Sequence, residues 1–280
     1  MNINSAIIEG TNILKKNFIK SAFLDAEILM AKVLNEDKEY LLLNYKKELN
    51  KKILDRYMEL IKKRSYKKPV AYLINKKFFW NYEFLVSKDT LIPRPDTELI
   101  IEVVLNLTKN KNKLNILDIG IGSGCILLSI LKEKYNFYGT GIDVSKNCLN
   151  ICKINAKNLN VFNRVKLFKS DVDKFNIGKY DLIVSNPPYI KKHNIKNLEK
   201  DVASYEPTLA LNGGLDGLSE IRKVIKQSSE LIKKKGKLIL EIGFDQKNSV
   251  INLLKKKGFY INSIQKDLAH NYRCIVCTKI

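Results

Sequence analysis

The sequence lacks the features that mark membrane and secreted proteins. No apolar run approaches the roughly 18 residues that a membrane-spanning helix needs. The first residues, Met1 to Gly10, have neither a basic start nor an apolar stretch of signal-peptide length. We therefore expect a cytoplasmic protein that has no membrane partner.

Histidine is nearly absent and the cysteines are odd in number, which limits metal and disulfide chemistry. The chain has two histidines, and its five cysteines are Cys125, Cys148, Cys152, Cys274 and Cys277. Cys274 and Cys277 have the spacing of a redox motif or of half a zinc site, but no second ligand pair is present. They lie in a β-branched run, where positions three apart face opposite sides of a sheet. We interpret all five as free thiols of the core and surface, and we expect no metal.

Proline, glycine and alanine are sparse, whereas lysine and asparagine are plentiful. The formal net charge of +21 indicates either an anionic partner, such as RNA or the ribosome, or a drift of the whole composition towards A- and T-rich codons. Residues 1–90 carry 18 Lys and Arg against 11 Asp and Glu, and residues 91–280 carry 32 against 18. Because the excess is spread out rather than gathered into one stripe, both explanations stay open.

The length of 280 residues allows two domains, and a composition of 45% apolar and 28% charged residues is ordinary for a soluble protein. Residues 1–75 predict a helical domain without a catalytic constellation, which either binds a partner or adds stability. Ser21 to Leu34 has apolar side chains at helical spacing, with Ser21 in the N-cap position, and Leu49 to Tyr66 is a second amphipathic stretch. In residues 76–92, aromatic segments on both sides of Asn81 predict a β-hairpin that links two domains.

The rest of the chain, residues 93–280, alternates between strand and helix patterns, which predicts an α/β domain with a parallel sheet. The strands are expected at 115–119, 138–142, 165–168, 180–184 and 237–242, with a closing antiparallel pair at 260–264 and 273–278. A helix is expected over residues 218–234.

The main catalytic candidate is Ser185 to Ile190, Ser-Asn-Pro-Pro-Tyr-Ile, which follows a buried β-branched strand. Pro187 and Pro188 cannot donate to a strand ladder, so Asn186 lies at the carboxyl end of that strand, where open α/β sheets bind ligands. The side-chain carbonyl of Asn186 and the main-chain carbonyl of Pro187 can accept both N–H bonds of a planar amino group. Tyr189 offers a flat apolar face. The pattern is typical of methyltransferases that act on amide or exocyclic amino nitrogens, and a proline-stiffened turn is the plain structural alternative.

Three further elements at strand ends predict a cofactor site. Gly120 to Gly124 follows the first strand and precedes an apolar helix, and its glycines let the backbone approach a ligand closely. Its Gly-x-Gly-x-Gly spacing differs from the Gly-x-Gly-x-x-Gly of dinucleotide-binding proteins. Asp143 ends the next strand, where a carboxylate can accept ribose hydroxyls. Asp171 and Val172 follow the third strand, where side chains can border an adenine.

The segment Leu91 to Glu98 is extended and leads into a helix that Asp96 or Thr97 can cap. Arg94 stands between two prolines and has two interpretations that stay open, a structural ion pair or a contact with substrate or cofactor. The sequence also predicts a basic mobile loop over the site at Lys191 to Lys200. An ordered active-site loop is expected at Val202 to Pro207 and Ala210 to Gly217.

Taken together, these segments closely resemble the peptide-chain-release-factor glutamine methyltransferases, the HemK/PrmC family. The matching motifs are Leu24 to Glu27, Pro69 to Leu73, Leu91 to Glu98, Asp118 to Gly124, Ser185 to Ile190, Tyr205 to Pro207 and Gly213 to Gly217. They cover most of the chain, and the combination of Pro-Arg-Pro-Asp-Thr-Glu with Asn-Pro-Pro-Tyr is highly specific. Three stretches depart from the pattern of the family, at Tyr66 to Lys68, Val172 and His270 to Arg273.

The resemblance implies a small N-terminal helical domain for substrate recognition (1–75), a hairpin linker (76–92) and a Rossmann-like, seven-stranded class I S-adenosylmethionine-dependent methyltransferase domain (93–280). It implies that S-adenosylmethionine binds to Gly120, Ile121, Gly122, Ser123, Gly124, Asp143, Asp171, Val172 and Asn186. It also places the substrate glutamine on Asn186, Pro187, Pro188 and Tyr189. From the chemistry of the motif we expect Asn186 and Pro187 to be the catalytic groups, and Arg94 is a further candidate substrate contact.

The substrate that the resemblance implies is the glutamine of the Gly-Gly-Gln motif in bacterial release factors 1 and 2, methylated at N5 by a monomeric enzyme that supports translation termination. Two other classes of function remain. An amino-methyltransferase for DNA adenine or ribosomal RNA guanine shares Asn-Pro-Pro-Tyr but needs a base-flipping pocket and usually a recognition domain, so we expect no direct DNA substrate. A non-catalytic RNA-binding or ribosome-binding protein explains the charge but not the cofactor loop.

Overall fold

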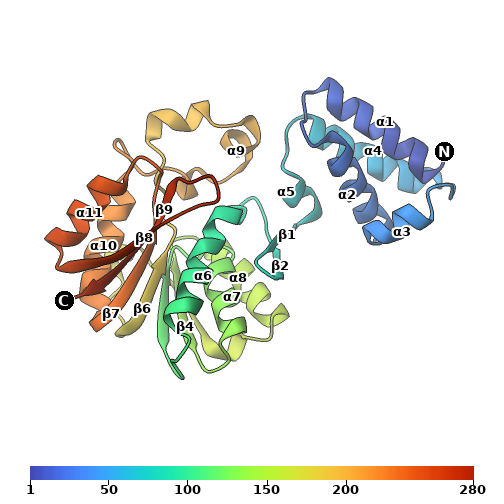
Figure 1. Ribbon diagram of the computed structural model, residues 1–280. Coiled ribbons are helices and arrows are strands. Elements are labelled where there is room, and N and C mark those ends of the chain that lie inside the picture. The colour runs from blue at the N-terminus through green and yellow to red at the C-terminus, as the bar shows by residue number, and fades with distance from the viewer. The chain divides into compact units, whose positions relative to one another are not determined.

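The computed structural model describes residues 1–280 and divides into two compact units (Figure 1). The smaller unit comprises Met1–Lys76 together with Glu199–Tyr205. The larger unit comprises Lys77–Leu198 and Glu206–Ile280. None of the helices combines the length and the apolar character that crossing a membrane requires.

The smaller unit is built from helices. They are α1 (Ile3–Lys16), α2 (Ala22–Leu34), α3 (Lys38–Leu43), α4 (Lys51–Ser65), α5 (Val70–Ile74) and α9 (Lys200–Tyr205). Asn2 and Asn50 cap α1 and α4, since their side chains accept main-chain N–H bonds of the first turn. Ser21 directly precedes α2, as predicted, but its side chain makes no capping hydrogen bond. The apolar faces of α1, α2 and α4 form one core that includes Ile3, Ile7, Leu14, Leu29, Met30, Tyr57 and Ile61.

Arg64 connects three elements inside the smaller unit. Its guanidinium donates to Asp25 of α2 at 2.7 Å, and both side chains are buried. Asp201 of α9 lies 3.9 Å from the same guanidinium, and the hydroxyl of Tyr205 donates to the carbonyl of Tyr66 at 2.9 Å. These contacts hold α9 in the smaller unit. The expectation that residues 202–205 belong to an active-site loop is therefore wrong, because their partners lie in the N-terminal helices.

The larger unit is built on a seven-stranded sheet in the order β5-β4-β3-β6-β7-β9-β8. Its strands are β3 (Asn115–Ile119), β4 (Tyr138–Asp143), β5 (Val165–Lys169), β6 (Tyr180–Ser185), β7 (Ile232–Glu241), β8 (Phe259–Lys266) and β9 (Tyr272–Lys279). The first five run parallel, whereas β9 is antiparallel to both β7 and β8. The predicted α/β fold with its closing antiparallel pair is confirmed.

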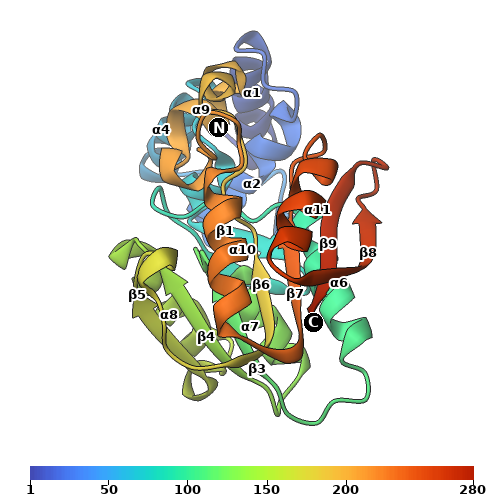
Figure 2. The ribbon, with the colours of Figure 1, turned by 90° about the vertical axis from the view of Figure 1, so that its left-hand side faces the viewer.

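Helices cover both faces of this sheet (Figure 2). One face carries α6 (Glu98–Leu107), α7 (Cys125–Glu133) and α8 (Lys146–Asn158), and the other carries α10 (Ser219–Leu231) and α11 (Lys247–Lys256). Short 3-10 helices occupy the connections at Pro95–Thr97, Phe162–Arg164, Val172–Lys174, Lys192–Asn197 and Thr208–Ala210. Cys274 packs into one core and Cys277 into the other, so the prediction that they face opposite sides of the sheet is confirmed. All five cysteines are free.

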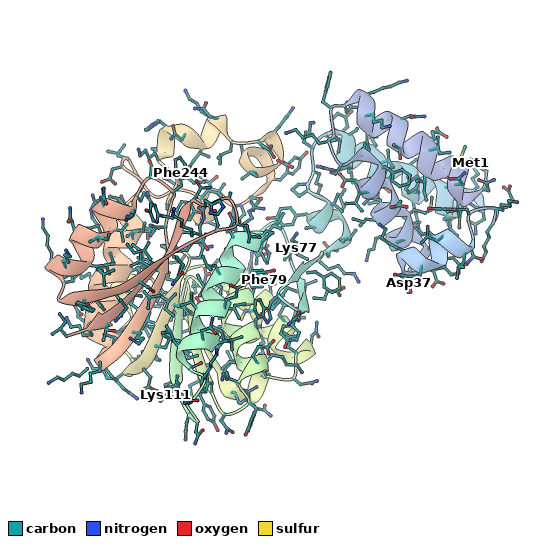
Figure 3. The ribbon with its side chains drawn as sticks, in the orientation of Figure 1. Met1, Asp37, Lys77, Phe79, Lys111 and Phe244 are labelled. Carbon is teal, nitrogen blue, oxygen red and sulfur yellow. The ribbon has the colours of Figure 1, made fainter.

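A two-stranded hairpin opens the larger unit, with β1 (Lys76–Phe79) paired to β2 (Tyr82–Leu85). Phe79, which Figure 3 labels, and Phe84 are buried, and their rings meet edge to face at 6.1 Å. Leu85 bonds to the buried Asn155 of α8 in both directions, at 2.8 and 3.0 Å. The predicted hairpin around Asn81 is present, and its aromatic side chains are part of the core of the larger unit.

Two elements differ from the sequence-based expectation. Strand β7 begins at Ile232 rather than at residue 237, because its pairing with β6 shifts register and leaves the exposed Lys233 to Lys235 within the strand. That run of lysines is the reason why the sequence pattern suggested a continuing helix. The predicted basic loop over residues 191–200 contains a 3-10 helix at Lys192–Asn197.

Candidate active site

The predicted catalytic segment begins where β6 ends, as the two prolines require. Ser185, the last residue of the strand, is buried and donates to the carbonyl of Ile119 in β3 at 2.7 Å. The side-chain amide nitrogen of Asn186 donates to the hydroxyl oxygen of Thr97 at 3.0 Å. Oδ1 is the acceptor of this amide, and with the nitrogen directed to Thr97 it is left for a ligand. Asn186 lines a cavity of the larger unit.

The residues after Asn186 differ in their exposure to that cavity. Pro187 and Pro188 line it. Tyr189 does not, because its ring packs against the core beneath α10 and α11, and its hydroxyl donates to Glu241 at 3.2 Å. Burial and the neighbouring carboxyl raise the pKa of the Tyr189 phenol. The flat apolar face expected of Tyr189 therefore lies largely within the core.

A glycine-rich loop, Gly213 to Gly217, packs against the catalytic segment. The N–H of Gly213 donates to the carbonyl of Ile190 at 2.8 Å, which pairs the two stretches side by side. A Cβ on Gly213 would lie 2.8 Å from the Cα of Tyr189, and one on Gly217 would lie 2.6 Å from the Tyr189 carbonyl oxygen. Only glycine fits this close approach, which gives the Gly-Gly-Leu-Asp-Gly motif a structural reason.

Gln246 joins three loops at this end of the sheet. Its side-chain NH₂ donates to the carbonyls of Tyr189 and Gly217, each at 3.0 Å, and its Oε1 accepts the N–H of Gly243 at 2.9 Å. The side chain is buried, so these bonds replace the water that the loop ends would otherwise bind. No motif in the sequence marks this glutamine, and nothing short of the fold identifies its partners.

The predicted cofactor loop follows β3 and bends back to β4. Gly120 and Gly122 have positive φ angles of 78° and 54°, which favour glycine. Asp143, at the end of β4, accepts the N–H of Gly122 at 2.9 Å and the N–H of Ser145 at 2.8 Å. A Cβ placed on Gly120 or Gly122 would meet no atom within 4 Å, so the two glycines border open space.

The remaining members of the predicted loop do not line the cavity. Ile121 is buried in the core, and Gly124 packs tightly against Leu128 and Cys152 at the start of α7. The carbonyl of Ser123 accepts a hydrogen bond from Asn155 at 2.8 Å. These residues fix the shape of the loop, whereas Gly120 and Gly122 present its surface to the cavity.

Asp171 and Val172 follow β5 and also line the cavity. The carboxylate of Asp171 accepts the N–H of Asp173 at 3.3 Å and so caps the short 3-10 helix that begins at Val172. The structure thus brings the glycine loop, Asp143, Asp171, Val172 and Asn186 together around one space.

This space is a cavity of about 320 Å³ at the carboxyl ends of the parallel strands. Besides the predicted residues it is lined by Lys88, Asp89, Leu91, Pro207, Leu209, Ala210, Glu220 and Val224, among others. Pro207 and Ala210 belong to the predicted active-site loop, whereas the others were not expected at the site. The Tyr-Glu-Pro motif at residues 205–207 indicated that Pro207 lies at the site. Residues 88–91 carry no chemical pattern that would have indicated a ligand contact.

Arg94 pairs with the carboxylate of Glu206 and does not line the cavity. The other oxygen of Glu206 accepts the N–H of Ile92 at 3.2 Å, and the Glu206 side chain is only 1% exposed. Glu206 directly precedes Pro207, so the ion pair holds that wall of the cavity in place. The contact fits the structural interpretation of Arg94, and a role in binding substrate stays a prediction.

Two acids near the site are buried and lack a full set of partners. Both oxygens of Asp118 in β3 and Oε2 of Glu241 in β7 have no hydrogen-bond partner. Burial raises the pKa of each of these carboxyls to about 7. Neither acid was predicted to titrate near neutral pH.

Comparison with solved structures identifies the class of the fold. Ribosomal protein L11 methylase from Lactobacillus delbrueckii subsp. bulgaricus superimposes with a TM-score of 0.51 and 18% identity, over 67% of this chain and 81% of that one. The sheet order and the loops at its carboxyl edge define a Rossmann-like methyltransferase. Residues 5–74 match the PrmC N-terminal domain, and residues 96–215 match the methyltransferase small domain.

Sequence relatives identify the family. The release factor glutamine methyltransferase of Clostridium acetobutylicum is 36% identical over 100% of this chain and 99% of its own length. The enzymes of the same name from Clostridium botulinum and Buchnera aphidicola are 39% and 38% identical, over 100% and 98% of both chains. This chain belongs to the release factor glutamine methyltransferase family and is an enzyme.

Proposed function

We propose that this enzyme transfers a methyl group from S-adenosylmethionine to the side-chain amide nitrogen, N5, of the glutamine in the Gly-Gly-Gln motif of release factors 1 and 2. The observation that carries the proposal is the orientation of Asn186. Its nitrogen is bonded to Thr97, so its oxygen is available beside a cavity that the glycine loop also lines. An acceptor of this kind fits the N–H bonds of a primary amide.

The residues around the cavity fit S-adenosylmethionine. Gly120 and Gly122 border open space that a Cβ would enter, as a close approach to a ligand requires. Asp143 retains lone pairs for ribose hydroxyls beside the two N–H bonds that it accepts, and Asp171 and Val172 border the far wall. When bound, S-adenosylmethionine supplies an electrophilic methyl group whose bond to sulfur breaks as the new bond to nitrogen forms.

The amide nitrogen of glutamine is a poor nucleophile because its lone pair is delocalised into the carbonyl. The Asn186 side-chain oxygen and the Pro187 carbonyl can each accept one of its two N–H bonds, which orients the lone pair and stabilises the positive charge that develops on nitrogen. After transfer the nitrogen is cationic and strongly acidic, so it releases one proton to solvent. The chain needs no covalent intermediate for this reaction.

The helical unit is proposed to recognise the release factor. It contains no cluster of catalytic side chains, and it presents apolar residues to solvent, including Phe18, Phe23, Leu42 and Leu43. Contact with a protein partner would remove these groups from water.

Methylation of purified release factors 1 and 2, with the product mapped by mass spectrometry, tests the substrate. Duplex DNA serves as the parallel substrate that should remain unmodified. Asn186→Ala should lower kcat by about 10²–10³, by analogy with the loss of one preorganised polar group. Asn186→Asp should retain more activity than the alanine variant, because it keeps an acceptor. Wild-type rates in Asn186→Ala, or modification at a site other than the glutamine, would contradict the proposal.

A further inference from the structure

The amide of Asn186 must point one way for the proposed reaction. Its oxygen and nitrogen are nearly the same size, so shape alone does not select between the two orientations. A reversed amide would present N–H donors to the N–H donors of the substrate. Some neighbouring group must therefore hold Asn186 with Oδ1 towards the cavity.

Thr97 is the direct neighbour that can do this. It lies at the start of α6, it is 2% exposed, and its Oγ1 is 3.0 Å from Nδ2 of Asn186. We expected Asp96 or Thr97 to cap α6, but the Thr97 side chain makes no capping hydrogen bond. A hydroxyl can donate as well as accept, so Thr97 selects the amide orientation only if its own proton is committed elsewhere.

Glu241 carries a buried oxygen that could accept that proton. It ends β7, beside the end of β6, and its carboxyl is buried. Oε1 accepts the hydroxyl of Tyr189 at 3.2 Å, whereas Oε2 has no partner at ordinary hydrogen-bond geometry. β6 and β7 pair up to Ser185 and Leu240, so Glu241 is next in register to Asn186, the residue to which Thr97 bonds. The Thr97 hydroxyl is thus placed to serve the unpaired side of Glu241.

No cation forms an ion pair with Glu241, so a hydroxyl is the available hydrogen-bond donor for its Oε2. Arg273 of β9 is the nearby cation, but its guanidinium pairs with Asp267 at 2.9 Å and lies 3.6 Å from Asp96. No ion pair joins Arg273 to Glu241, although its charge acts on the carboxyl at longer range. The hydroxyl of Tyr189 is therefore the hydrogen-bond donor that the structure gives to this carboxyl, and Oε2 is left for a further donor.

We propose that Thr97 and Glu241 are positioning residues, which direct a hydrogen-bond chain from Asn186 through Thr97 to Glu241 and thereby keep Oδ1 of Asn186 towards the substrate. This inference rests on the proposed catalytic role of Asn186. Glu241 also holds the hydroxyl of Tyr189, so one carboxyl acts on both ends of the Asn-Pro-Pro-Tyr segment.

The test compares Thr97→Val with Thr97→Ser. Valine has nearly the shape of threonine but leaves Nδ2 of Asn186 without an acceptor, whereas serine keeps the hydroxyl. Thr97→Val should lower kcat on release factor by about 10-fold or more, while its affinity for S-adenosylmethionine, measured by calorimetry, stays unchanged. Thr97→Ser should recover most of the rate. Thr108→Val is the matched control, because Thr108 is buried at the other end of α6 and its hydroxyl bonds only within that helix.

A double-mutant cycle separates positioning from a general loss of structure. In an Asn186→Ala background, Thr97→Val should have no further effect on kcat, because the group through which it acts is gone. Equal kcat for Thr97→Val and wild type would overturn the inference, and so would an undiminished effect in the Asn186→Ala background. If Asn186→Ala is itself fully active, the proposed function fails first, which is a distinguishable result.

Discussion

The side-chain amide of Gln246 donates to the main-chain carbonyl of Tyr189 at 3.0 Å. The same nitrogen bonds to Gly217, and the amide oxygen accepts from Gly243, so one buried side chain holds three loops of the active-site edge. The position of the catalytic segment therefore depends on a residue that lies outside the cavity.

Gln246→Ala should lower both stability and activity. It leaves two carbonyls and one N–H without partners, which costs about 2–4 kcal/mol of unfolding free energy. Because Tyr189 loses its restraint, kcat should fall while affinity for S-adenosylmethionine changes little. Chemical denaturation and steady-state kinetics measure the two effects. Gln265→Ala is the control, since that amide bonds only to Ser263 within β8, and it should leave kcat at the wild-type value.

The cofactor loop gives a second prediction. Gly122 has φ of 54° and borders the cavity, so Gly122→Val should combine backbone strain with loss of space and abolish measurable binding of S-adenosylmethionine. Asp143→Ala should weaken binding by about 1.5–3 kcal/mol, through loss of a charged acceptor. Isothermal titration calorimetry measures both.

Gly178→Val is the matched control for that experiment. Gly178 also has a positive φ, 82°, but it lies outside the cavity that holds Gly122. The Gly178→Val variant should be less stable than wild type and should bind S-adenosylmethionine with unchanged affinity. Unchanged affinity in both Gly122→Val and Asp143→Ala would place the cofactor elsewhere.

Local rules of the chain were sufficient to predict much of this fold. The Pro187-Pro188 pair ends β6 at Asn186 because proline cannot continue a ladder, and that rule needs no knowledge of the other strands. The opposite orientations of Cys274 and Cys277 follow likewise from the two-residue period of a strand. Features of this kind depend on residues that are neighbours in the sequence.

The parts that could not be predicted depend on partners far apart in the chain. Asn186 and Thr97 are 89 positions apart, and Gln246 is 57 from Tyr189, so no spacing rule connects them. Residues 202–207 were predicted as part of an active-site loop, but residues 202–205 belong with the N-terminal helices. In each case tertiary packing selects the partner, and hydrophobic periodicity carries no information about it.

Stability should fall as the pH rises towards neutrality, because of the buried acids. Burial raises the pKa of Asp118 to about 7 from an ordinary value of 3.8, so between these limits the folded protein holds a proton that the unfolded chain releases. The stabilisation from this group is complete below pH 3.8 and is lost as the pH rises through about 7. Glu241 acts in the same direction between 4.5 and about 7.

Asp118→Asn should therefore raise the unfolding free energy at pH 8, by up to about 4 kcal/mol, and have much less effect at pH 4. Urea denaturation at both pH values, with each variant compared with wild type at the same pH, measures the difference. Asp181→Asn is the contrasting control. Asp181 pairs with Lys233 at 2.7 Å and accepts the N–H of Asn115, so its neutral replacement should lose stability at pH 8. A destabilised Asp118→Asn at pH 8 would show that its charged form is compensated.

The last prediction concerns the helical unit. Phe18 is 88% exposed, and its φ of 56° is a conformation that a phenylalanine adopts only at a cost. Neither property helps the domain to fold, which is why we expect its ring to contact the release factor. Phe18→Asn removes the ring and suits the left-handed conformation, so stability should be unchanged or slightly higher. KM for intact release factor should rise by about 10-fold, in the range of a residue at the centre of an interface. Affinity for S-adenosylmethionine and the rate on a short Gly-Gly-Gln peptide should stay at wild-type values.

Tyr135→Asn is the control for Phe18→Asn. It removes an aromatic ring that is 78% exposed near the start of β4, whereas the cavity lies at the carboxyl ends of the strands. Tyr135→Asn should leave stability, KM, cofactor affinity and the rate on the peptide unchanged. An equal KM for wild type and Phe18→Asn would exclude this part of the helical unit from the contact.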